Sequence, residues 1–92
     1  MDEHLNDTMT RIRRVFVESL HLNIRDDQVR YEQMLEDVAI LDSIALLEFV
    51  TAVETEFGIR MEPALLDFDF LRDLPALALY IEHRIEAAGA GA

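Results

Sequence analysis

Apolar residues recur at helical spacing in three stretches of the chain, and this pattern limits the fold more than any other feature. In the first stretch they lie three or four positions apart, so on a helix they form one continuous stripe. The members of this stripe are Leu5, Met9, Ile12, Phe16 and Leu20. We therefore predict a helix over about residues 3–21, with Arg11, Arg14 and Glu18 on the opposite side.

The second stretch predicts a helix that begins at Asp42 and Ser43, which are good N-cap residues, and ends at Gly58, a common helix stop. Projected at about 100° per residue, about a third of its circumference is apolar and forms the core stripe. These residues are Leu46, Phe49, Val50, Val53 and Phe57, and we expect both phenylalanines in the core. The opposite side carries Ile44, Glu48, Thr51 and Thr55, with Leu47 on its flank. Ile44 is therefore expected to be apolar and exposed.

The third stretch predicts the last helix, which Asp73 caps and which has Pro75 in its first turn. Its apolar stripe is Leu74, Leu77, Ala78, Ile81 and Ile85. Small residues and glycine follow, and chain ends of this composition fray. We therefore place one domain at residues 1–86 and a flexible C-terminal tail at residues 87–92.

Residues 22–41 are predicted to form a long connection, because their apolar residues are irregularly spaced and turn formers lie among them. The expected buried anchors of this connection are Leu22, Ile24, Val29, Tyr31, Leu35, Val38, Ile40 and Leu41. One or two helical turns are expected after Pro63, over residues 64–66. The predicted fold is all-α: a small four-helix bundle of three main helices and one short helix, with a long loop between helices 1 and 2.

The charge of the chain restricts its partners. Nineteen acids and eight bases give the 92 residues a net charge of −11, and every base is an arginine. Residues 31–92 hold thirteen acids and three arginines, a net charge of −10. Such a surface repels nucleic acid and anionic membranes and steers toward basic protein surfaces. With no cysteine, no metal-ligand pattern and no apolar run long enough for a membrane span, we expect a cytoplasmic protein without a metal site or membrane insertion.

Ser43 lies at a predicted helix N-terminus, where unpaired N–H groups and the helix dipole favour a phosphate carried on that serine. An ordinary helix cap explains such a serine equally well. No histidine or lysine is near it in sequence to activate it as a nucleophile. Ile44, Leu47 and Glu48 cluster beside it and predict a docking face with an apolar centre and an acidic rim.

The residues Leu41-Asp42-Ser43-Ile44, followed by Leu47-Glu48, Val53-Glu54 and Glu56-Phe57-Gly58, resemble the acyl carrier protein family at its phosphopantetheine attachment motif. The resemblance extends to Leu35, at the position of an apolar loop anchor, and to the last helix. It covers most of residues 5–85. The resemblance implies that Ser43 carries covalent 4′-phosphopantetheine and that Asp42 supports its attachment by a separate phosphopantetheinyl transferase.

The resemblance further implies a monomeric carrier without catalytic activity, which holds acyl or aminoacyl groups as thioesters. Its partners would be the transferase, acyl or aminoacyl ligases, and downstream synthases or transferases. By position, the docking residues are Ile44, Leu47, Glu48, Thr51, Glu54 and Thr55. We expect Glu48 and Glu54 to lack basic partners and to matter little for stability. The motif is most similar to discrete carriers of polyketide, nonribosomal peptide or related specialised pathways.

The sequence departs from the family pattern at three positions. Ala39 replaces a frequent glycine before the motif, Ala45 replaces an acid, and Thr55 replaces the second acid of a pair. A different function is also compatible with the same face. An unmodified acidic helical adaptor would bind one basic protein through Ile44, Leu47 and Glu48. The two hypotheses differ in whether Ser43 is modified.

Overall fold

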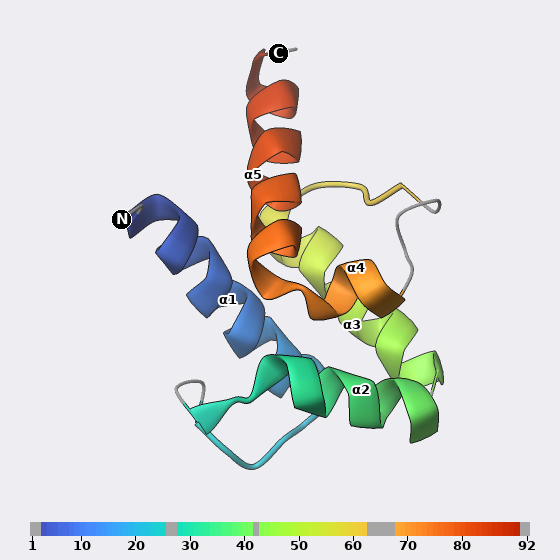
Figure 1. Cartoon of the computed structure of the whole chain (residues 1–92). Coiled ribbons are helices and arrows are strands. Elements are labelled where there is room, and N and C mark those ends of the chain that lie inside the picture. The colour runs from blue at the N-terminus through green and yellow to red at the C-terminus, as the bar shows by residue number, and fades with distance from the viewer. Residues whose placement is uncertain (1–2, 26–27, 42, 63–67, 91–92) are drawn as a thin grey trace.

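The computed structural model describes residues 3–25, 28–41, 43–62 and 68–90, and every regular element within these ranges is a helix. The five helices are α1 (Glu3–Ser19), α2 (Tyr31–Leu41), α3 (Ser43–Phe57), α4 (Phe68–Arg72) and α5 (Leu74–Ala90). Figure 1 shows α1 and α5 side by side, with α2 crossing one end of the bundle. α1 packs against α3 and α5, while α2 packs against α3 and α4. The predicted all-α bundle is confirmed.

Three aromatic rings from three helices meet at the centre of the core. The ring centroids of Phe16 and Phe49 are 5.2 Å apart, and those of Phe16 and Tyr31 are 5.4 Å apart, both in edge-on geometry. Tyr31 and Phe49 complete the cluster at 5.9 Å. Such edge-to-face pairs add about 0.5–1.5 kcal/mol each beyond the burial of their surface. The cluster therefore joins α1, α2 and α3 at one point.

The predicted apolar stripes are buried in their central parts, but Phe57 and Ile85 at the ends of two stripes are not fully buried. Ile12, Phe16, Phe49, Leu77 and Ile81 have no exposed surface. The prediction that Phe57 is a core residue is wrong, because its side chain is only half-buried and the Arg11 guanidinium lies 4.4 Å from its ring centroid. Ile85 is 40% exposed, since the stripe of α5 continues beyond the helices that cover its first turns.

The predicted long loop is wrong over residues 31–41, which form the helix α2. Tyr31 and Leu35 lie one turn apart and are both buried, so this stretch has its own helical period when it is separated from residues 22–30. The Tyr31 hydroxyl donates a hydrogen bond of 2.6 Å to the buried carbonyl of Leu71. Ile24 is not an anchor, because 37% of it is exposed. The side chains of Val38, Ile40 and Leu41 lie outside the described part of the structure.

Local backbone chemistry fixes the ends of the long helices. α3 ends at Gly58, whose φ of +66° suits glycine, and the Ile59 N–H donates to the Glu54 carbonyl in a Schellman motif. The same motif follows α1: His21 has a φ of +55°, and the Leu22 N–H donates to the Val17 carbonyl at 3.0 Å. The predicted cap of α5 is confirmed, because an Asp73 carboxylate oxygen accepts the N–H of Ala76 at 3.1 Å.

Two predicted boundaries differ from the structure. The short helix spans Phe68–Arg72, whereas the turns predicted at residues 64–66 lie outside the described residues. α5 continues to Ala90, four residues beyond the predicted domain end at Glu86. The division into a domain and a flexible tail stays a prediction.

Candidate functional site

Ser43 is the first residue of α3, and α2 ends at Leu41. The N-terminal end of a helix is the positive end of its dipole. A phosphate group joined to residue 43 would therefore meet a favourable electrostatic environment. Asp42, the other predicted residue of the motif, lies outside the described residues.

The first turns of α3 present apolar side chains to solvent. Ile44 is 67% exposed and Leu47 is 59% exposed, the two highest values among the exposed large apolar residues described. Glu48, Thr51 and Thr55 are also exposed. The exposed side of the predicted α3 projection is therefore confirmed, and these five residues share one solvent-facing side of the helix. We call this side the α3 face.

Glu54 differs from the other predicted docking residues. It is half-buried, and its carboxylate oxygen accepts the backbone N–H of Met61 at 2.8 Å. The bond holds the chain segment that reverses direction after Gly58 and places Met61 in the core. Glu54 was expected to lack a basic partner and to matter little for stability. Its partner is a backbone group rather than a base, and this contact gives the carboxylate a structural role that the second expectation did not include.

The far end of α3 is tied to α1 by two arginines that share one carboxylate. The Arg11 Nη2 lies 2.9 Å and the Arg14 Nη2 lies 3.3 Å from Glu56 Oε2. Arg11 also donates through Nε at 3.1 Å. The sequence places both arginines on the outer side of α1 and does not predict this contact, because Glu56 lies 45 positions after Arg11 and 42 after Arg14, and residues so far apart share no local pattern.

Comparison with known protein families matches residues 10–81 to the family described as "phosphopantetheine attachment site". The chain belongs to this family. Its members carry 4′-phosphopantetheine covalently on a serine, and the chain is accordingly a phosphopantetheine carrier. Carriers of this family are modified by phosphopantetheinyl transferases and work with synthases and ligases. The resemblance found in the sequence is thereby confirmed. No solved structure matches the chain.

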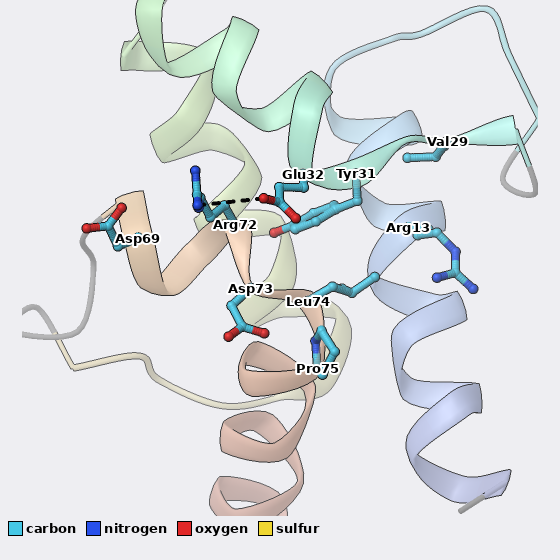
Figure 2. Close-up of a pocket in the computed structure, with 9 residues that line it drawn as sticks. All are labelled: Arg13, Val29, Tyr31, Glu32, Asp69, Arg72, Asp73, Leu74 and Pro75. Atoms are coloured by element: carbon cyan, nitrogen blue, oxygen red, sulfur yellow. Dashed lines mark ion pairs between the residues drawn. The ribbon is translucent and has the colours of Figure 1, made fainter. Parts of the chain in front are cut away.

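The carrier also has a cleft of about 740 Å³ that the sequence did not predict. Figure 2 shows it between the start of α2, the α4–α5 junction and α1, with Glu32 and Arg72 paired across it at 3.7 Å. Its walls are Arg13, Val29, Tyr31, Glu32, Asp69, Arg72, Asp73, Leu74 and Pro75. The cleft lies at the N-terminal end of α2, whereas Ser43 lies beyond its C-terminal end. Its lining mixes both charges and favours neither an anion nor a cation.

The longest described helices of the carrier, α1 and α5, have 17 residues each. Over the residues that the structure describes, none combines the length and the apolar character that crossing a bilayer requires.

Proposed function

We propose that Ser43 is the serine that bears the phosphopantetheine arm. The chain contains two serines, Ser19 and Ser43. Ser19 lies in the last turn of α1, and its hydroxyl donates to the Phe16 carbonyl at 3.4 Å. Ser43 begins a helix and is followed by the exposed Ile44. The observation that supports Ser43 most is this combination of a helix N-terminus and an adjoining apolar surface.

The attachment reaction is a phosphoryl-type transfer from coenzyme A. The Ser43 oxygen forms a bond to the phosphorus nearest the pantetheine, and the bond from that phosphorus to the oxygen of 3′,5′-adenosine diphosphate breaks. The serine proton passes to a base of the transferase, since the residues next to Ser43 in sequence include no histidine or lysine. By its position in the motif, Asp42 is proposed to support this transfer. Once attached, the arm supplies a terminal thiol that carries an acyl or aminoacyl group as a thioester.

The α3 face is proposed as the docking surface for the transferase and for the enzymes that load and unload the arm. Ile44 and Leu47 offer an exposed apolar centre, and Glu48 gives the face a negative charge suited to a basic partner. Glu54 is also proposed as a docking residue because of its position in the family motif, in addition to its hydrogen bond with the Met61 N–H. The protein itself has no catalytic step in this proposal.

We further propose that the protein is a discrete carrier in a polyketide, nonribosomal peptide or related pathway. Support comes from the Ile-Leu-Asp-Ser-Ile motif at residues 40–44. Its monomeric state and its cytoplasmic location stay predictions. The adaptor hypothesis is not favoured, because the matching family is defined by the attachment of the arm.

The experiment is intact-mass measurement after incubation with coenzyme A and a broad-specificity phosphopantetheinyl transferase. We expect the wild type and Ser19→Ala to gain the mass of one phosphopantetheine and Ser43→Ala to gain nothing. Modification of Ser43→Ala, or loss of modification in Ser19→Ala, would refute the assignment. The loaded protein, offered acyl and aminoacyl groups by candidate ligases, then identifies the cargo.

A further inference from the structure

A groove of about 440 Å³ runs between α1 and α3. Its lining residues are Val15, Glu18, Ser19, Ala52, Thr55 and Glu56. Val15 is buried and Ala52 half-buried, so small apolar side chains form the floor. The other four residues are polar and form the rim.

The groove adjoins the α3 face. Thr55 belongs to both, and Ala52 lies one helical turn after Glu48, so the two residues are neighbours on the helix surface. A protein that covers the α3 face would therefore reach the groove without a gap. This continuity makes the groove a candidate extension of the docking surface onto α1.

The polar rim offers hydrogen-bond acceptors. The Ser19 hydroxyl has one proton and directs it to the Phe16 carbonyl, and the Thr55 hydroxyl directs its proton to the Thr51 carbonyl at 3.1 Å. Each hydroxyl oxygen has lone pairs that can in addition accept a hydrogen bond. Carboxylates at neutral pH are acceptors only. A ligand that matches this rim must bring several donors.

Glu18 supplies the charge that such a ligand would meet. Arg14 is four positions earlier on α1, but its guanidinium lies at Glu56 instead. Within the described residues, no basic side chain forms an ion pair with the exposed Glu18 carboxylate. Glu56, in contrast, is already shared by Arg11 and Arg14. The groove thus has one carboxylate with no ion-pair partner beside an apolar floor.

We propose that this groove receives an arginine side chain of the phosphopantetheinyl transferase. A guanidinium has five N–H donors and no acceptor, which suits a rim of acceptors. The methylene stem of arginine would lie on Val15 and Ala52 while its head meets Glu18. The proposal rests on the proposed function, because it requires that the transferase dock on the α3 face.

The test compares Glu18→Gln and Glu18→Arg with Asp7→Asn and Asp7→Arg. Asp7 is an exposed acid on the same helix and does not line the groove, so each control makes the same change of net charge. At low ionic strength we expect kcat/KM for modification to fall about threefold in Glu18→Gln and about tenfold in Glu18→Arg, through KM rather than kcat. At high salt the differences shrink. Both Asp7 variants stay close to the wild type.

A contact measurement separates the groove from a general charge effect. Unlabelled transferase is added to the ¹⁵N-labelled Ser43→Ala protein, which cannot be modified, and amide shifts are followed. We expect the amides of Ser19 and Thr55 to shift together with those of Ile44 and Leu47. Equal rates for the Glu18 and Asp7 variants, or shifts confined to residues 44–51, overturn the groove proposal. A wild type that gains no phosphopantetheine overturns the proposed function, and the groove proposal with it.

Discussion

The hydrogen bond from Tyr31 to Leu71 makes the substitution Tyr31→Phe a sharp test of how α2 is held. The change removes one buried hydroxyl and keeps the ring that packs against Phe16 and Phe49. The residue four positions after Leu71 is Pro75, which has no N–H with which to replace the lost donor. Leaving a buried carbonyl unsatisfied costs about 1–3 kcal/mol. We expect the free energy of unfolding to fall by about 1–2 kcal/mol, well below the ~3–5 kcal/mol of a ring deletion.

The assay is urea unfolding followed by circular dichroism. With an m-value near ~1 kcal/mol/M, the midpoint should fall by about 1–2 M urea with m unchanged. The matched control is Tyr80→Phe, which removes a hydroxyl that accepts an N–H from the exposed residue Glu62 at 3.1 Å. Water can replace that contact, so we expect a loss below ~0.5 kcal/mol. Equal losses for the two tyrosines would refute the claim that burial of the Tyr31 hydrogen bond is what holds α2.

Three further predictions concern stability. Glu54→Ala should lower the free energy of unfolding by about 1–2 kcal/mol, because the Met61 N–H loses its carboxylate acceptor. Glu48→Ala should change the free energy of unfolding by less than ~0.5 kcal/mol, and urea unfolding of the two variants measures the difference. Gly58→Ala should cost about 1 kcal/mol, because an alanine must adopt the left-handed backbone of Gly58. The added Cβ meets no atom within 4 Å, so no steric clash adds to this cost, and Tm should fall by about 4–8 °C. Burial raises the pKa of the Tyr31 phenol above its ordinary value near 10. The contribution of Tyr31 to the free energy of unfolding should therefore be constant up to about pH 10 and then fall by at most ~1.4 kcal/mol per pH unit. Urea midpoints from pH 8 to 11.5 should show this fall in the wild type and not in Tyr31→Phe.

The sequence predicted those parts of the fold that depend on local periodicity. In α1 and the middle of α3, one side of the helix is buried along several turns, so the apolar spacing alone places Ile12, Phe16, Phe49 and Val53 correctly. α2 was missed because its two described buried residues, Tyr31 and Leu35, stand in a run of apolar residues that also includes the irregular segment before it.

The site residues show the same division. Exposure of Ile44 follows from the projection of a single helix, and the structure confirms it. The role of Glu54 depends on the reversal after Gly58, which returns the Met61 N–H to a carboxylate seven positions earlier. The groove and the cleft each need two or more helices in contact, and no spacing within one helix encodes which helices meet.

The Arg11–Glu56–Arg14 cluster bears on how the proposed thioester escapes attack by amines of the protein. It uses guanidinium groups to join α1 and α3, and all eight basic side chains of the 92 residues are arginines. Thioesters are attacked by neutral amines, and a lysine that loses its proton becomes such a nucleophile. A guanidinium keeps its proton at neutral pH, because its pKa is above about 12. The ion pairs that join α1 to α3 therefore contain no amine that could accept the acyl group proposed for the arm.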